Sequence, residues 1–247
     1  MAEYDNRVRS LNATATGAVA IDEGLRAYML RVYNYMLMGL ALSGATAWIA
    51  LNTPLGALFF AQTATGFSLS PLGWILFFAP LALVFFLSFR IHAMSFATAQ
   101  MVFWAYAALN GIALAPIMLL YTATSVAQVF FVTAATFGAM SLWGYTTKRD
   151  LTGWGSFLFM GLIGIIIASV VNIFLGSGTM SLVISIIGVI VFTGLTAYDT
   201  QKIKEQYDVV SHDGQLAGKS AIMGALNLYL DFINLFLMLL RLLGDRR

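Results

Sequence analysis

The chain contains no cysteine and few charged residues, and each shortage excludes a class of protein. Without cysteine there is no disulfide, no thiolate metal site and no cysteine nucleophile. Charged residues make up 10% of the 247 residues, whereas a soluble domain has about 25%. A chain that is 60% hydrophobic at this length cannot bury its apolar sequence in a water-soluble core. The composition therefore predicts an integral membrane protein, and a net charge of +2 gives no reason to expect a nucleic-acid partner.

Seven apolar runs are long enough to cross a membrane, which takes about 20 residues each. They lie at residues 32–51, 72–89, 96–120, 125–146, 154–175, 180–199 and 220–243. We therefore predict an all-α integral membrane protein with seven transmembrane helices. The last run has an alternative, in which it re-enters the membrane and returns, but its length favours a full crossing. Residues 1–26 are polar and are predicted to form a cytoplasmic tail, followed by a single transmembrane domain over residues 27–247.

The distribution of basic residues predicts the orientation of the chain. Lys and Arg residues precede the first run and follow the second, fourth and sixth, whereas the connections near 52–71, 121–124 and 176–179 contain none. Because basic residues concentrate on the cytoplasmic side, this alternation predicts a cytoplasmic N-terminus. The polar start of the chain has no apolar region ahead of a cleavage site, so no secretory signal is expected.

Two aspartates, Asp199 and Asp231, lie within or at the end of apolar runs. A charge at the centre of a bilayer costs about 2.5–3.5 kcal/mol, so such residues usually serve protons, ions or catalysis. Residues three and four apart share one face of a helix, which gives each aspartate a polar stripe. The stripes are Thr193, Thr196, Asp199 and Thr200 in the sixth run, and Asn227, Asp231 and Asn234 in the seventh. We expect the two stripes to face each other inside the bundle.

Two neighbouring carboxyl groups in a low-dielectric site resist ionising together, so the pair shares a proton and can titrate near physiological pH. When both are ionised they repel each other and attract a cation, most strongly a divalent one. A tight calcium site needs about six to eight oxygen ligands, so Asp199 and Asp231 are expected to form a weak or transit calcium site. The alternative is that each aspartate is neutral, or separately hydrogen-bonded to Tyr198, Tyr229 or a backbone carbonyl.

The predicted depths of the two aspartates differ. Asp199 closes its run at the cytoplasmic end, whereas Asp231 lies roughly 16 Å into a helix that begins at Ser220, at 1.5 Å per residue. They meet only if the last helix begins above the membrane surface, or if a water-filled vestibule reaches down to it. We therefore predict a cytoplasm-facing cavity with residues 205–219 as its rim. The candidates to line the pathway are Thr196, Tyr198, Asn227, Tyr229 and Asn234.

Arg90 follows the second apolar run. It either extends to the lipid headgroups or pairs with Asp199, which is predicted at a similar depth. No enzyme signature is found. Residues 198–199 match one half of an intramembrane aspartyl protease signature, but residues 228–231 lack the glycines of the other half. Both histidines are predicted in loops, and no phosphate loop or dinucleotide motif occurs. We therefore expect a protein that is not an enzyme and has no cofactor.

Three segments resemble signature segments of the Bax inhibitor-1 (TMBIM) family. They are GlyTyrThrThrLysArgAspLeu (144–151), GlyLeuThrAlaTyrAspThrGln (194–201) and AlaLeuAsnLeuTyrLeuAspPheIleAsnLeuPheLeuMetLeuLeuArg (225–241). The resemblance covers the chain beyond about the first 25 residues and is closest in style to bacterial members. It implies a bundle in which the last helix is central and wrapped by the other six. Residues 212–218 make the segment between the aspartates longer than in compact members.

The resemblance also implies a function, a pH-sensitive cation (calcium) leak channel gated by protonation of an aspartate pair. Asp199 and Asp231 match the family's pH-sensing latch, and Arg90 matches by placement the arginine that alternates with it. Calcium and protons are then the permeant or regulatory ions. The alternative is a membrane regulator without ion flux, because a bacterial relative is linked to restraint of a membrane-bound AAA protease and eukaryotic members to suppression of cell death. The expected location is the bacterial inner membrane.

Overall fold

The computed structural model describes the backbone of residues 2–54, 56–63 and 66–247, and the side chains of these residues apart from 2–22, 57, 60–63 and 66–69. In chain order the elements are α1 (Ala2–Asn52), α2 (Gly56–Phe59), β1 (Phe60–Thr63), β2 (Gly66–Leu69), α3 (Pro71–Arg90), a 3-10 turn (Ile91–Ala93), α4 (Phe96–Leu120), α5 (Ala123–Thr146), α6 (Thr152–Leu175), α7 (Gly178–Val210) and α8 (Gly214–Leu243). Within the described residues, seven of these helices are long and apolar enough to cross a membrane. The predicted all-α membrane fold is confirmed, with one addition. The connection after α1 holds a short antiparallel hairpin, in which Phe60 pairs with Leu69.

Three helices extend by at least six residues beyond the apolar runs that predicted them. Helix α1 begins at Ala2, so the residues predicted as a polar tail continue the first helix. Helix α7 continues past Asp199 to Val210, and α8 begins at Gly214. Apolar run length finds only the part of a helix that lipid surrounds, and polar helical turns beyond it are missed.

The extension of α7 is held by packing against α8. Ile203 is only 2% exposed. Its side chain packs closely against Gly224 of α8, because a Cβ added at Gly224 would lie 3.1 Å from an Ile203 carbon. At the turn between the helices, the Asp213 carboxylate accepts hydrogen bonds from the backbone N–H groups of Gln215 and Leu216, which caps the start of α8.

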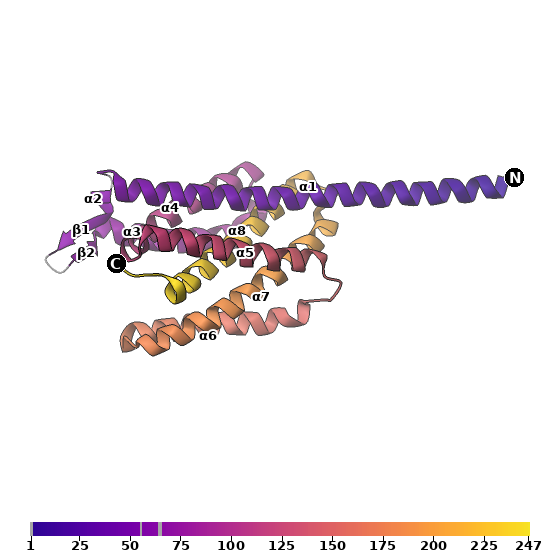
Figure 1. Ribbon diagram of the computed structural model, residues 1–247. Helices are drawn as coiled ribbons and strands as arrows, with labels where there is room; N and C mark the ends of the chain where they lie inside the picture. Colours follow the sequence, from indigo (N-terminus) through magenta and orange to yellow (C-terminus); the bar gives the residue numbers. More distant parts are fainter. Residues whose placement is uncertain (1, 55, 64–65) are drawn as a thin grey trace.

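Helix α8 is the central helix of the bundle (Figure 1). In the most apolar part of α8, 67% of the residues are buried, against 11–44% for the other six helices. It packs against α1, α4, α5 and α7, while α3 packs mainly on α4 and α6 on α7. A central helix contacts other helices on all sides instead of lipid, and this explains why α8 is the most buried of the seven.

The last helix crosses the whole bundle, which excludes the re-entrant alternative. The residues after α8 reach the connection between α4 and α5. The backbone N–H of Thr122 donates to the Asp245 carbonyl at 3.0 Å, and the N–H of Arg247 donates to the Leu120 carbonyl at 3.0 Å. The start of α8 lies at the opposite end of the molecule, because Lys219 Nζ donates to the carbonyls of His92 and Met94, just before α4.

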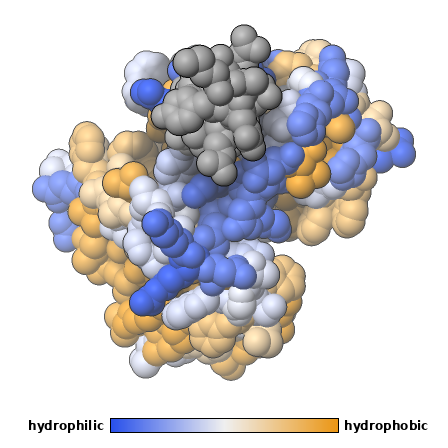
Figure 2. All heavy atoms as spheres, turned by 90° about the vertical axis from the view of Figure 1, so that its right-hand side faces the viewer, coloured by the Kyte–Doolittle hydropathy of each residue, from blue (hydrophilic) through white to orange (hydrophobic). Residues whose placement is uncertain are grey.

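Basic residues gather at the end of the bundle where α8 begins. Lys204 Nζ donates to the Tyr145 carbonyl at 2.8 Å, and Lys219 joins the connection between α3 and α4. Figure 2 looks onto this end and shows a band of hydrophilic side chains across the face, with hydrophobic ones on both sides of it. We call this the basic end. Its assignment to the cytoplasm remains a prediction from the charge pattern.

Candidate functional site

A cleft of about 480 Å³ lies between α6, α7 and α8. The residues that line it come from three helices: Gly155, Ser156, Phe159 and Leu162 of α6; Phe192, Leu195, Tyr198, Asp199 and Lys202 of α7; and Asn227, Leu230, Asp231 and Asn234 of α8. The cleft exists because α6 packs on α7 and stands apart from the central helix. Its polar residues all come from α7 and α8, except for Ser156.

Asp199 and Asp231 both line this cleft, and their carboxyl groups lie within hydrogen-bonding reach of each other. Asp231 is only 4% exposed, while Asp199 is half-buried at the cleft wall. Oδ2 of Asp231 is buried without a hydrogen-bond donor. Since an ionised carboxylate can only accept, two ionised carboxylates cannot bond to each other. A proton on either group supplies a donor for a hydrogen bond between them.

The polar stripe predicted on the last helix is present as one face. Asn227 and Asn234 line the cleft on either side of Asp231. Asn234 donates its Nδ2 to the Leu230 carbonyl at 2.8 Å, which leaves its side-chain oxygen as an acceptor in the cleft wall. The face therefore presents two amide side chains next to the carboxylate.

The predicted stripe on α7 is divided between two faces. Thr196 is 0% exposed and donates to the Phe192 carbonyl, and Thr200 donates to the Thr196 carbonyl and contacts Ser141 of α5. Neither lines the cleft, so the prediction that Thr196 lines the pathway is wrong. The physical reason is that a threonine hydroxyl satisfies itself on the carbonyl four residues earlier, so its polarity does not mark a polar face.

Tyr198 and Lys202 complete the α7 side of the cleft. The Tyr198 ring lies against Gly155 of α6, where an added Cβ would be 2.6 Å from ring carbons. Glycine at this position therefore makes room for the ring. Lys202 Nζ lies 5.8 Å from the centre of the Tyr198 ring and acts electrostatically on Asp199. Sequence reasoning missed Lys202, although its spacing of three from Asp199 places both on one helical face.

Tyr229 lies on the opposite side of α8 from the cleft. Two residues along a helix turn about 200°, so Tyr229 points away from the face of Asp231. It is 0% exposed, and its hydroxyl contacts Ser43 Oγ of α1 at 2.7 Å and accepts from Asn110 Nδ2 of α4 at 2.7 Å. The prediction that Tyr229 lines the pathway is wrong. It joins three helices in the core.

Arg90 is the last residue of α3 and is exposed. It is not one of the residues that line the cleft, and the cation that acts on Asp199 in this conformation is Lys202. The predicted pairing of Arg90 with Asp199 is not made among the described residues, because α3 packs on α4 rather than beside α7. A gating role for Arg90 stays a prediction.

The rim predicted for the cavity is also wrong. None of residues 205–219 lines the cleft, and these residues form the end of α7, a tight turn and the start of α8. The depth difference between the aspartates is resolved by these helical extensions, because α8 begins well before Ser220. The cleft is instead bounded at the basic end by Gly155, Ser156 and Lys202.

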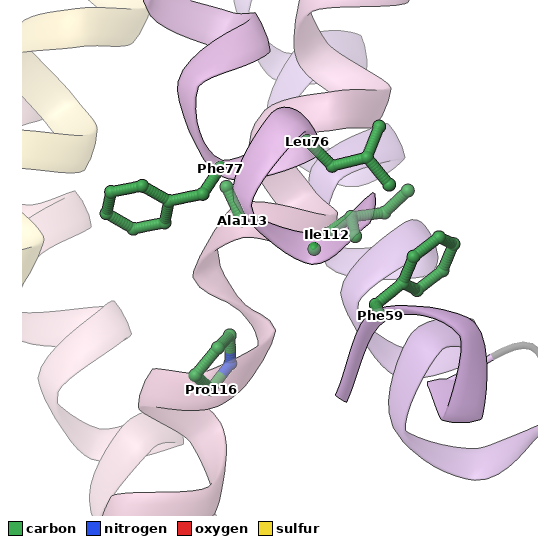
Figure 3. A pocket seen from close by; sticks show the side chains of 7 residues that line it. Phe59, Leu76, Phe77, Ile112, Ala113 and Pro116 are labelled. Atoms are coloured by element: carbon green, nitrogen blue, oxygen red, sulfur yellow. The ribbon is translucent and has the colours of Figure 1, made fainter. Parts of the chain in front are cut away.

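A second, much smaller pocket lies near the other end of the bundle, between α2, α3 and α4 (Figure 3). Its volume is about 10 Å³, and every side chain lining it is apolar. Pro116, inside α4, forms part of its wall. A pocket that barely holds one water and offers no side-chain donor or acceptor is a packing defect rather than an ion site.

Comparison with known proteins identifies the family. A family model described as inhibitor of apoptosis-promoting Bax1 matches residues 25–247. The chain is 52% identical over 229 residues to an uncharacterised protein of Rickettsia prowazekii, covering 92% of each chain. It is 50% identical over 230 residues to the inner membrane protein YbhL of Escherichia coli K12, covering 91% of this chain and 94% of YbhL. A protein of Caulobacter vibrioides is 44% identical over 231 residues, covering 93% of this chain and 92% of its own. The protein therefore belongs to the Bax inhibitor-1 family of membrane proteins.

Proposed function

We propose that this protein is a pH-sensitive cation leak channel of a bacterial inner membrane, with calcium as the permeant ion. The observation that carries the proposal is the contact between the Asp199 and Asp231 carboxyl groups in the wall of the cleft. The inner-membrane location is proposed from the similarity to YbhL, which is named as an inner membrane protein.

The aspartate pair can hold one, two or no protons. The interaction between the two carboxyl groups differs in strength among these three states. With one proton, a neutral carboxyl donates to a carboxylate, and such a charge-assisted hydrogen bond is roughly twice as strong as a neutral one. With two protons the bond is between neutral groups. With none, two like charges repel each other in a site of low dielectric constant. The singly protonated pair therefore holds α7 against α8 most firmly, and we assign it to the closed state.

Loss of the shared proton also prepares the site for a cation. The two carboxylates and the amide oxygens of Asn227 and Asn234 are hard oxygen ligands of the kind that calcium prefers. Lys202 opposes the cation, because it places a positive charge beside Asp199. Four protein side chains fall short of the six to eight ligands of a tight calcium site, which suits an ion that passes rather than one that stays.

The test is calcium flux into liposomes that contain the purified protein, measured over a series of pH values. Flux should pass through a minimum where the pair holds one proton and rise on both sides. A hydrogen bond to a charged group contributes about 1.5–3 kcal/mol, so the rise should reach roughly tenfold to a hundredfold at high pH, where the bond is lost. The rise at low pH should be smaller, because a bond between neutral groups remains. Asp199→Asn and Asp231→Asn each leave one aspartate, which accepts from the new amide when it is ionised and donates to it when it is protonated. Both variants should therefore lose the rise of flux at high pH, because two like charges no longer form.

Asp208→Asn is the matched control. Asp208 lies on α7, is exposed and does not line the cleft, so this variant should keep the wild-type minimum. If both cleft variants retain the wild-type pH profile, the proposed gate is wrong. If the wild-type protein carries no calcium at any pH, the channel proposal fails and the alternative of a membrane regulator acting on a membrane-bound protease becomes the working hypothesis.

A further inference from the structure

A second groove, of about 440 Å³, lies between α1 and α5. Both helices pack on α7 and α8, and Figure 1 shows them running along the same side of the bundle. The α1 wall includes Arg26, Leu30 and Tyr33, which are spaced by four and three residues and so share one helical face. The groove uses none of the residues that line the aspartate cleft.

The α5 wall is mostly apolar and has a gap in its middle. It includes Gly138 and Leu142, and Leu142 is 64% exposed. A Cβ added at Gly138 would meet nothing within 4 Å, so the missing side chain deepens the groove. The groove is therefore wide enough at this point for an additional apolar chain.

The polar atoms inside the groove are already satisfied. The Tyr33 hydroxyl and Ser141 Oγ are 2.6 Å apart, and Ser141 Oγ is 2.9 Å from Thr200 Oγ1 of α7. The depth of the groove therefore needs no hydrogen bond from an occupant. Both walls belong to helices long and apolar enough to cross a membrane, which places the groove beside lipid tails.

The rim of the groove is positively charged and lies at the basic end. Arg26 is exposed there. Lys204 Nζ donates to the Tyr145 carbonyl at 2.8 Å and lies 5.3 Å from the centre of the Tyr145 ring, which is part of the groove. An ammonium group has three donors, so Lys204 keeps capacity for an anion. Glu23 and Glu205 are exposed neighbours of these cations and reduce the positive potential.

We propose that this groove binds one acyl chain of an anionic phospholipid, whose headgroup lies against Arg26 and Lys204. The occupant must be apolar along its length and negatively charged at one end, because the groove offers a satisfied apolar interior and a cationic rim. Basic pockets between transmembrane helices bind acidic headgroups in this way. The site is independent of ion flux, and its test uses no flux measurement.

The test is native mass spectrometry of the purified full chain, delipidated and then given phosphatidylglycerol or phosphatidylcholine with identical acyl chains. The wild-type protein should retain phosphatidylglycerol about 25-fold better, as expected for two favourable basic contacts to an anionic lipid. Arg26→Gln should reduce this preference about fivefold, because Lys204 remains. Arg31→Gln, on the same helix but outside the groove, should keep it.

A second pair of variants tests the acyl chain. Gly138→Leu fills the groove without a backbone clash and should reduce retention of both lipids. Gly164→Leu is its control, because a side chain on α6 at that position also meets nothing within 4 Å and does not enter the groove. The proposal is overturned if the wild type retains both lipids equally, or if Gly138→Leu retains as much phosphatidylglycerol as Gly164→Leu. It is also overturned if glycerol phosphate, which has the headgroup charge without acyl chains, displaces the lipid at equal concentration.

Discussion

Removing one hydroxyl from the core tests how the central helix is held. Ser43 Oγ donates to the carbonyls of Gly39 and Ala107, so its proton is in use. The Tyr229 hydroxyl must therefore donate to Ser43 Oγ, while it accepts from Asn110 Nδ2. Tyr229→Phe removes both of these bonds in a fully buried position.

The expected cost of Tyr229→Phe follows from the partners left behind. An unsatisfied buried donor costs about 1–3 kcal/mol, but hydrogen bonds between transmembrane helices average about 0.6 and reach about 1.7 kcal/mol. Ser43 keeps its own two acceptors, so Asn110 carries most of the loss. We therefore expect Tyr229→Phe to lower the free energy of unfolding by about 1–2 kcal/mol.

The assay is unfolding in mixed micelles with increasing sodium dodecyl sulfate, followed by far-ultraviolet circular dichroism. Tyr106→Phe is the control, because its ring packs 5.3 Å from the Tyr229 ring and its hydroxyl takes no part in this network. The control should cost less than about 0.5 kcal/mol. Adding Asn110→Leu to Tyr229→Phe should cost less than the sum of the single changes, by at least about 0.5 kcal/mol. Equal losses for Tyr229→Phe and Tyr106→Phe would refute the reasoning, as would strict additivity.

Two further changes test the contacts that α7 makes with α5 and with the α5–α6 connection. Gly144→Ala places a Cβ 2.9 Å from Ala197 Cα and even closer to the Ala197 carbonyl oxygen, so separating α5 from α7 should lower stability by about 1–3 kcal/mol in the same assay. Gly164→Ala meets open space and should be neutral or stabilising by up to about 1 kcal/mol, and a matching loss there would contradict the clash. Gln201→Leu removes both hydrogen bonds that tie the α5–α6 connection to α7, at 2.8 Å each, so trypsin should cleave that connection about fivefold faster. Gln206→Leu, at an exposed position of α7, should leave the cleavage rate unchanged. Equal cleavage rates for the two variants would show that Gln201 does not hold the connection.

Residue by residue, the sequence predicted the α8 side of the cleft better than the α7 side. The spacing of Asn227, Asp231 and Asn234 gave the correct face because all three side chains are too polar to face lipid. On α7 the same argument failed for Thr196, whose hydroxyl bonds to its own helix. Lys202 was assigned to a connection because the apolar run stops at Asp199, although the helix continues to Val210.

Arg90 and Tyr229 show why helix neighbours could not be read from the chain. Most of these helices are apolar on all sides, so no repeat of hydrophobicity marks an inner face. Arg90 and Asp199 were predicted at a similar depth in the membrane, which suggested that their side chains could pair. Pairing also requires that their helices be neighbours. The position of α3 on α4 is set by packing between distant segments, which no local pattern records.

By itself the sequence determined the membrane class, the seven crossings and the presence of two costly aspartates on the last two helices. These follow from local properties, which are the length of apolar runs and the free-energy cost of a charge among lipids. Tertiary structure decided that the two carboxyl groups lie within hydrogen-bonding reach of each other, that Lys202 rather than Arg90 is the nearby cation, and that Tyr229 belongs to the core. These three features depend on how each helix is rotated about its axis and on which helices are neighbours. Rotation and neighbours are fixed by close contacts between helices, such as Gly144 against Ala197 and Tyr198 against Gly155.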